Sequence, residues 1–139
     1  MPNGGFNVYS HAESKKYYSW YDKESSLWKT KWWDSGNSGS TTVGDPICNP
    51  DENDKTEGKA SARLNSRFIV VKFAAGNVFC GEFAGLDGLS GGKVNFGRPW
   101  TLRPRKLCFD LKYEPGIVDN ENGYPAGQPV KKGDTDRGQ

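Results

Sequence analysis

The sequence predicts an all-β fold, an antiparallel β-sandwich, and three observations favour it. Only 34% of the 139 residues are hydrophobic while 13% are aromatic, so Trp, Tyr and Phe must supply much of the core. The usual hydrophobic share of a globular domain is ~45–50%. The 18 glycines fit a chain with many turns. Short segments alternate apolar and polar residues, a period of two that matches a strand and not a helix.

The N-terminal part predicts short strands followed by two loops. Residues 6–33 are rich in Trp and Tyr at irregular intervals, which indicates short strands joined by turns. Residues 34–40 consist of Asp, Ser, Gly and Asn, which favour a turn-rich loop. Residues 44–58 are polar and acidic and include two prolines, so they predict a second loop.

Clearer strand signals follow in the middle of the chain. Apolar and polar residues alternate from Ala60 to Asn65, which predicts a half-buried strand. The apolar run from Phe68 to Phe73 is β-branched and aromatic, and predicts a buried central strand that is covered on both faces. Residues 78–83 and 94–96 predict two more strands, separated by a glycine-rich turn at residues 85–92.

The strongest strand pattern lies at residues 105–113, where apolar and polar residues alternate strictly. The face predicted to be buried holds Leu107, Phe109, Leu111 and Tyr113, and the other face holds Cys108, Asp110 and Lys112. Residues 114–139 have few apolar groups and predict a loop or tail. The expected organisation is therefore one β-sandwich domain over residues 1–113, followed by a loop or tail over residues 114–139.

These strands supply one sheet comfortably and a second sheet only in part. The run at residues 68–73 needs cover on both faces, and the C-terminal residues offer few apolar groups for it. A long unpaired strand edge is also prone to aggregation. We therefore expect the sandwich to be incomplete in this chain. A further polypeptide segment, a second chain or another copy of the same chain is expected to complete it.

Charge and composition argue against several classes of protein. The 19 basic and 17 acidic residues are interspersed and the pI is 8.4, so no basic face for nucleic acid is predicted. No apolar run of ~18 residues exists, and no signal peptide is expected in this chain. His11 is the only histidine and lies in a polar segment, so we expect no catalytic Ser–His or Cys–His pair and no enzyme. The three well-separated cysteines allow at most one disulfide.

The aromatic residues suggest a carbohydrate site. Sugar rings stack their C–H faces on Trp and Tyr, and sugar hydroxyls need planar polar partners. Trp32 and Trp33 are adjacent, so on a strand their side chains point to opposite faces and one of them can leave the core. Arg98 and Arg103 each precede a proline, which favours extended backbone. The candidate ligand-binding residues are Trp32, Trp33, Asn37, Arg98, Trp100 and Arg103. The alternative is that the aromatic residues belong to the core.

The acidic loop at residues 44–58 is a candidate site for a structural calcium ion. Carboxylates such as those of Asp45, Asp51 and Asp54 are the ligands that Ca²⁺ prefers. No EF-hand spacing is present, because Lys55 occupies the third ligand position counted from Asp51. The alternative is a solvated loop without metal. No other cofactor is expected.

Two stretches resemble a known family. Residues 74–81 read Ala-Ala-Gly-Asn-Val-Phe-Cys-Gly, and residues 96–104 read Phe-Gly-Arg-Pro-Trp-Thr-Leu-Arg-Pro. In this order they resemble the "putative carbohydrate metabolism domain" (PCMD) of Bacteroidetes-type surface and secreted proteins, and the likeness covers about Phe6 to Tyr113. Cys80 departs from the pattern, since the family more often has Thr there. The family domain continues through further strands, so the resemblance implies that this chain matches its N-terminal portion only.

The resemblance implies a jelly-roll-like β-sandwich similar to carbohydrate-binding modules, and an extracellular or cell-surface location. It carries over no catalytic residues. The function expected first is therefore non-catalytic glycan binding at a bacterial surface. The alternative is a structural or assembly module, a surface or virion component that uses the sandwich for contacts with other proteins.

Overall fold

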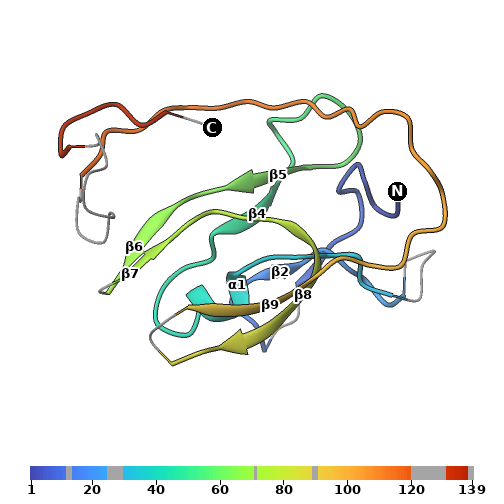
Figure 1. Cartoon of the computed structure of the whole chain (residues 1–139), viewed down its shortest axis with the longest axis horizontal. Helices are drawn as coiled ribbons and strands as arrows, with labels where there is room; N and C mark the ends of the chain where they lie inside the picture. Colours follow the sequence, from blue (N-terminus) through green and yellow to red (C-terminus); the bar gives the residue numbers. More distant parts are fainter. Residues whose placement is uncertain (12–13, 25–29, 71, 89–90, 120–130, 138–139) are drawn as a thin grey trace. The chain divides into compact units, whose positions relative to one another are not determined.

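The computed structural model describes residues 1–11, 14–24, 30–70, 72–88, 91–119 and 131–137. Its strands are all paired in the antiparallel sense, and the one helix among these residues has a single turn, so the prediction of an antiparallel all-β fold is confirmed (Figure 1). The chain divides into two units, residues 1–101 and residues 102–139. Within the described ranges, no helix is long and apolar enough to cross a membrane.

The first unit contains four small sheets and α1. The elements of these sheets are short, and the sheets do not close into a complete sandwich within the described residues. In chain order the elements are β1 (Ser10–His11), β2 (Tyr18–Ser19), β3 (Trp33–Asp34), α1 (Asn37–Ser40), β4 (Cys48–Asp51), β5 (Ser61–Leu64), β6 (Arg67–Ile69), β7 (Lys72–Ala74), β8 (Phe79–Leu86) and β9 (Gly92–Phe96). The sheets are β1–β2, β3–β8–β9, β4–β5 and β6–β7.

The three-stranded sheet is built around β8, the longest strand. Trp33 of β3 lies opposite Cys80, and Phe96 of β9 lies opposite Gly81. Gly81 has a φ of 144°, and a Cβ atom there would lie 2.2 Å from the backbone oxygen of Asn95. Only glycine fits this close approach of two strands, which explains why the middle of β8 carries no side chain.

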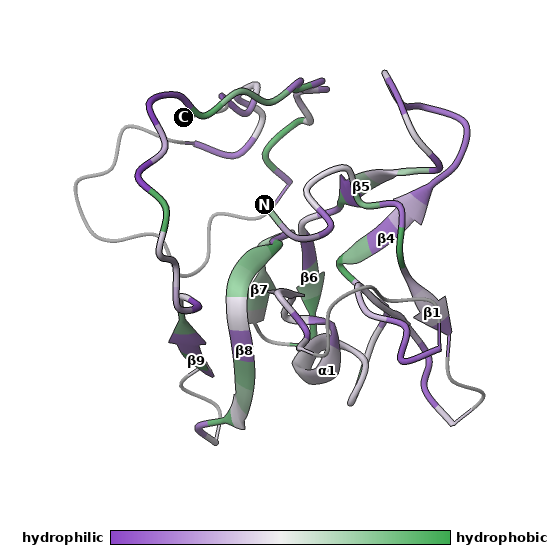
Figure 2. Ribbon diagram, turned by 90° about the vertical axis from the view of Figure 1, so that its right-hand side faces the viewer, coloured by the Kyte–Doolittle hydropathy of each residue, from purple (hydrophilic) through white to green (hydrophobic). Residues whose placement is uncertain are grey.

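α1 lies against β8 (Figure 2). A Cβ atom on Gly39 would come within 3.0 Å of Phe83 Cζ and of Leu86 Cδ2, so the small residue allows the close contact. The sequence predicted a loop at residues 34–40. A single helical turn forms at residues 37–40 instead. Its own backbone hydrogen bonds and the hydrogen bonds of the buried Asn37 side chain together hold the segment in place.

The core of the first unit contains Trp20, Ile47, Cys48 and Ala60, and half-buried aromatic rings surround Trp20. Trp20 is only 2% exposed, and its ring centroid lies 5.0 Å from that of Phe6 and 5.9 Å from that of Tyr9. Its indole N–H donates to the Sγ atom of Cys48 at 3.2 Å, and Cys48 is fully buried. Edge-on aromatic contacts of this kind stabilise small cores.

Asn37 is the most deeply buried polar residue described, with an exposed fraction of 0%. Its Oδ1 atom accepts hydrogen bonds from the backbone N–H groups of Ile47 and Cys48, both at 2.9 Å. Its Nδ2 atom donates to the backbone oxygen of Cys48 at 2.6 Å. The side chain therefore supplies hydrogen bonds to the backbone groups at the start of β4, as a neighbouring strand would. It also connects α1 to the β4–β5 sheet.

Two further predictions about the first unit were wrong. The acidic loop contains β4, which pairs with β5 from Cys48–Leu64 to Asp51–Ser61. The apolar run at residues 68–73 is not a buried central strand but the hairpin of β6 and β7, in which Phe68 lies opposite Phe73. The turn begins at Val70, which has a φ of 54° and is exposed, while Val71 lies outside the described residues. Because the two halves pair with each other, their backbone bonds form without cover on both faces.

The prediction for residues 105–113 was also wrong as to structure. This segment forms no strand with any described residue, and it belongs to the second unit, residues 102–139. The predicted domain boundary at residue 113 stays a prediction. The face predicted to be buried is exposed: Leu107 71%, Phe109 74%, Leu111 79% and Tyr113 46%. Alternation marks an amphipathic segment, but a strand forms only where a second strand pairs with it.

The rest of the second unit has little regular structure among its described residues. Ile117 and Thr135 form an isolated antiparallel bridge, and Val118 is buried. The Tyr113 hydroxyl donates to an Asp136 carboxylate oxygen at 2.7 Å, and this bond raises the pKa of Tyr113. The predicted tail at residues 114–139 includes residues 120–130, which lie outside the described residues.

We expect Asn37→Ala to lower the free energy of unfolding by about 3 kcal/mol, because three buried backbone groups of β4 lose their partner. Ser38→Ala is the matched control: Ser38 is the exposed neighbour on the same helical turn, and its loss should cost less than about 0.5 kcal/mol. Urea unfolding followed by Trp fluorescence measures both. Equal costs for the two variants would contradict the role assigned to Asn37.

The three cysteines are free thiols in the described structure, and we expect them to differ in reactivity. Burial raises the pKa of Cys48 to about 11; the hydrogen bond from Trp20 opposes this shift and the nearby Asp34 charge adds to it. Native protein treated with iodoacetamide near neutral pH should be labelled at exposed Cys108 and protected at Cys48, as mapped by mass spectrometry. Fast labelling of Cys48 in folded protein would show that the core is not formed as described.

The pKa of Cys48 is raised in the folded state, so the free energy of unfolding should fall as the pH rises from about 9 to about 11. This fall should be smaller in Cys48→Ala.

Candidate functional site

A polar groove with a volume of about 480 Å³ lies on the first unit between the ends of β3, α1 and β8. Small-molecule sites span ~300–1,000 Å³, so the groove has room for one sugar residue or more. We call it the β3–β8 groove. Its lining combines basic, acidic, hydroxyl and aromatic side chains, namely Lys15, Tyr17, Thr30, Lys31, Asp34, Ser38, Glu82, Phe83 and Arg98.

Asp34 is the buried centre of the groove. Its Oδ1 atom accepts from the Lys31 ammonium group at 2.6 Å and from the backbone N–H of Ser35 at 2.9 Å. Its Oδ2 atom accepts from the backbone N–H of Phe83 in β8 at 2.9 Å. One carboxylate therefore ties β3 to β8 and also holds Lys31 at the groove. Since both oxygen atoms are engaged by the protein, Asp34 acts as a positioning residue.

Arg98 forms another wall of the groove, and its side chain is 21% exposed. Its Nη2 atom donates to the backbone oxygen of Gly81 at 3.1 Å and lies 3.7 Å from a carboxylate oxygen of Glu82. Its Nε atom is buried and has no hydrogen-bond partner among the described residues. The guanidinium group is thus held in place by β8 but is not fully satisfied by it.

The aromatic surface of the groove comes from Tyr17 and Phe83. Tyr17 is half-buried, and the Lys15 ammonium group lies 5.5 Å from its ring centroid. The Phe83 ring is packed closely, because Cβ atoms built on Gly39 and Gly92 would come within 3.0 Å and 2.7 Å of it. Tyr17 is therefore the aromatic ring best placed to stack on a ligand, and Phe83 fixes the floor beside it.

The structure separates the tryptophans from the β3–β8 groove. Trp33 points inward, where its ring packs on Phe6 at 5.3 Å and its N–H donates to the backbone oxygen of Pro2 at 2.9 Å. Trp32 packs edge-on against Trp100 at 5.7 Å, and Trp100 is 42% exposed. Trp32 and Trp33 therefore have different ring partners, and Trp32 with Trp100 forms a second aromatic surface.

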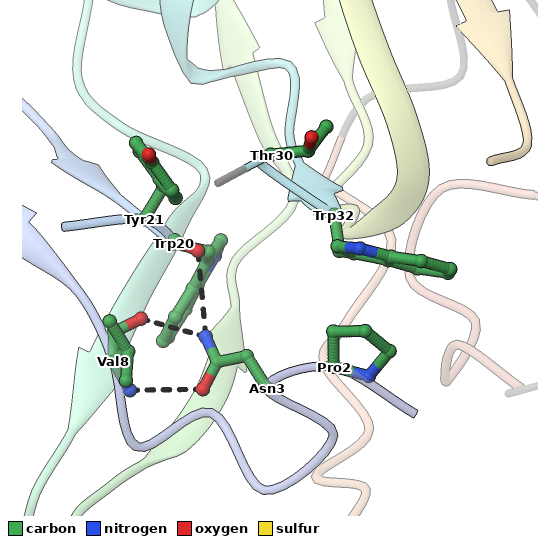
Figure 3. Close-up of a pocket in the computed structure, with 7 residues that line it drawn as sticks. All are labelled: Pro2, Asn3, Val8, Trp20, Tyr21, Thr30 and Trp32. Carbon is green, nitrogen blue, oxygen red and sulfur yellow. Dashed lines mark hydrogen bonds between the residues drawn. The ribbon is translucent and has the colours of Figure 1, made fainter. Parts of the chain in front are cut away.

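A small hollow lies beside Trp32. Figure 3 shows its centre, where the Asn3 amide bonds both backbone groups of Val8 and the backbone oxygen of Trp20. The hollow has a volume of about 10 Å³, enough for about one water molecule and too small for a sugar. Trp32 and Trp100 therefore offer an exposed ring pair and no pocket of their own.

Two predicted ligand-binding residues do not line the groove. Asn37 is fully buried, and its amide is hydrogen-bonded to backbone groups of Ile47 and Cys48. The short polar loop in the sequence suggested a surface position for Asn37. In the structure, its buried amide takes the place of a strand partner for Ile47 and Cys48. Arg103 is exposed in the second unit. Of the six predicted residues, the groove contains Arg98.

The side chains of two predicted metal ligands, Asp45 and Asp51, have protein partners. Asp45 pairs with Arg67 at 2.9 Å. Asp51 accepts from the backbone N–H groups of Asn53 and Asp54 and lies 3.5 Å from Arg63. Among the described residues, no group of three or more His, Cys, Asp or Glu side chains is arranged to hold a metal ion. Calcium binding by this loop stays a prediction that a calcium titration can test.

Sequence reasoning missed most of the groove. Lys15 and Tyr17 share one short segment, but Lys31 and Glu82 lie in two others, and no spacing along the chain links the three segments. Two signals were available. Tyr17 is part of the aromatic-rich N-terminal stretch, and Glu82 is the charged residue within an otherwise apolar strand. Neither indicates which partners the fold brings beside it.

The structure is that of an antiparallel all-β protein with a polar, partly aromatic groove. The chain belongs to the family described as "Putative carbohydrate metabolism domain" (PCMD), which matches residues 6–138. The family match confirms the resemblance noted in the sequence and extends past Tyr113. The family is thus one related to carbohydrate metabolism by its description. No curated protein and no solved structure matches the chain.

Proposed function

We propose that the protein is a non-catalytic glycan-binding module and that the β3–β8 groove is its binding site. The observation that carries the proposal is the meeting of a half-buried tyrosine ring with Asp34, Glu82, Arg98 and Lys31 in one groove of about 480 Å³. A sugar needs an aromatic face for its C–H groups and planar polar groups for its hydroxyls. The description of the family supports carbohydrate as the ligand class.

Binding rather than hydrolysis is proposed because of how the two carboxylates are used. Glycoside hydrolysis needs one carboxyl group to donate a proton and a second to act as base or nucleophile. Both oxygens of Asp34 accept hydrogen bonds from Lys31 and backbone N–H groups, which leaves Glu82 without a second free carboxylate in the groove. Intact glycan recovered after incubation with the protein would agree with this proposal. We extend it to a bacterial surface on the family resemblance alone.

We expect Tyr17→Ala to weaken glycan binding by about five- to tenfold, through loss of the stacking face. Tyr18→Ala is the matched control: Tyr18 is the next residue, lies on β2 and does not line the groove. Hits from a glycan array, measured again by calorimetry, provide the affinities. Thermal unfolding of both variants checks that they are folded. Equal binding by the two variants would contradict the site, and the absence of any bound glycan would contradict the function.

Arg98→Lys should weaken binding as well, because lysine cannot keep the bond to Gly81 and present a planar group to the ligand at the same time. Arg103→Lys is the control, since Arg103 also precedes proline but does not line the groove.

We propose protein–protein contact as a second function, since the alternating segment at residues 105–113 favours it. Four large apolar side chains on one side of this segment are exposed, and no described strand pairs with it. Extended segments of this kind associate by adding a strand to a sheet edge. The occupant we propose is another copy of the chain, which offers the same segment and completes the pairing symmetrically.

Sedimentation velocity over a range of protein concentration tests this association. We expect a dimer that Phe109→Asp disrupts, because a charge enters the apolar side. Cys108→Asp places the same charge on the opposite side of the alternation and should leave the dimer intact. A monomer at every concentration would contradict the proposal.

A further inference from the structure

The charges in the β3–β8 groove are unequal. Three basic side chains, Lys15, Lys31 and Arg98, face two acidic ones, Asp34 and Glu82. Asp34 is compensated by Lys31 at 2.6 Å and by two backbone N–H groups. Glu82 is 59% exposed and lies 3.7 Å from Arg98, so one basic group remains without an acidic counterpart.

The uncompensated group is Lys15. Its only recorded contact among the described residues is with the ring of Tyr17, whose centroid is 5.5 Å from the ammonium nitrogen. No carboxylate in the described part of the chain forms an ion pair with it. The ammonium group therefore lies over one face of the Tyr17 ring, so a sugar would stack on the opposite face, and its three donors are available to a ligand.

Arg98 adds a second cation, and its side chain is 21% exposed. Its Nε atom is buried, and its Nη2 atom is bonded to Gly81, so the guanidinium group is held in place by the fold. A half-buried guanidinium group has lost part of its hydration, and the charge of an anion in the groove would replace part of that interaction. Lys15 and Arg98 line the same groove, so a single anionic ligand can interact with the charge of both.

We propose that the groove selects anionic saccharides, sugars that carry a carboxylate or sulfate group, over neutral ones. This inference rests on the proposed glycan-binding function. The anionic group interacts with Lys15 and Arg98, while the sugar ring stacks on Tyr17. Asp34 and Lys31 compensate each other and serve to shape the groove. A neutral sugar would leave the excess positive charge without a partner.

A glycan array that contains uronic acid, sialic acid, sulfated and neutral glycans tests the selection, with the whole chain as probe. Binding should be concentrated in the carboxylated and sulfated glycans. For the best uronic acid ligand, calorimetry should show affinity about tenfold or more above that for its methyl ester, which has the same ring but no charge. The difference should shrink between about 0.1 M and about 1 M salt, because screening shortens from about 10 Å to about 3 Å.

Lys15→Gln and Lys16→Gln form a matched pair. Both residues are exposed and adjacent, and only Lys15 lines the groove. Lys15→Gln should reduce the preference for acid over ester by about tenfold, and Lys16→Gln should leave it unchanged. Binding of neutral glycans alone, or equal affinity for acid and ester, would overturn the selection and leave glycan binding standing. Binding of no glycan of either kind would overturn both. An equal effect of the two substitutions would show a general charge effect rather than a site.

Discussion

The hydrogen bonds of the buried Asn37 amide are the constraint on which the first unit depends. With an exposed fraction of 0%, this side chain bonds three backbone groups at the start of β4 and fixes that strand against α1. Leaving such groups unpaired in the interior is costly, so the amide can occupy only one arrangement. α1 in turn packs on β8 through Gly39, and both elements border the β3–β8 groove.

Asp34 makes the same kind of side-chain-to-backbone hydrogen bond closer to the surface. It is a short polar side chain that bonds the backbone of a distant strand, here Phe83 of β8. Asn77 does the same when its Oδ1 atom accepts from the backbone N–H of Gly36 at 2.8 Å. Buried polar groups of this kind specify a single arrangement in a protein whose hydrophobic content is low. The same bonds leave Asp34 fully engaged, which makes it a residue that shapes the groove and holds Lys31.

The two units differ in how their apolar residues are used. In the first unit, the rings of Trp20 and Phe6 pack on each other, and the indole N–H of Trp20 donates a hydrogen bond to Cys48. In the second unit, the apolar side chains at residues 107, 109, 111 and 113 are exposed. The difference follows from pairing, because β8 has strands on both sides and residues 105–113 have none among the described residues. The glycan and association proposals therefore concern separate parts of the chain.

The all-β class, the family, and strands close to β5, β8 and β9 could be predicted from the sequence alone, because period-two alternation and turn residues act locally. The remaining features depend on how distant segments meet in the fold. The run at residues 68–73 became a hairpin, and residues 105–113 formed no strand with a described residue, because a strand's partner lies outside its own segment. Contacts between distant segments also place Asn37 in the core. The same kind of contact brings Lys15, Tyr17 and Glu82 into one groove with Arg98. Burial and contact are set by segments far apart in the chain, and no local pattern encodes which of them will meet.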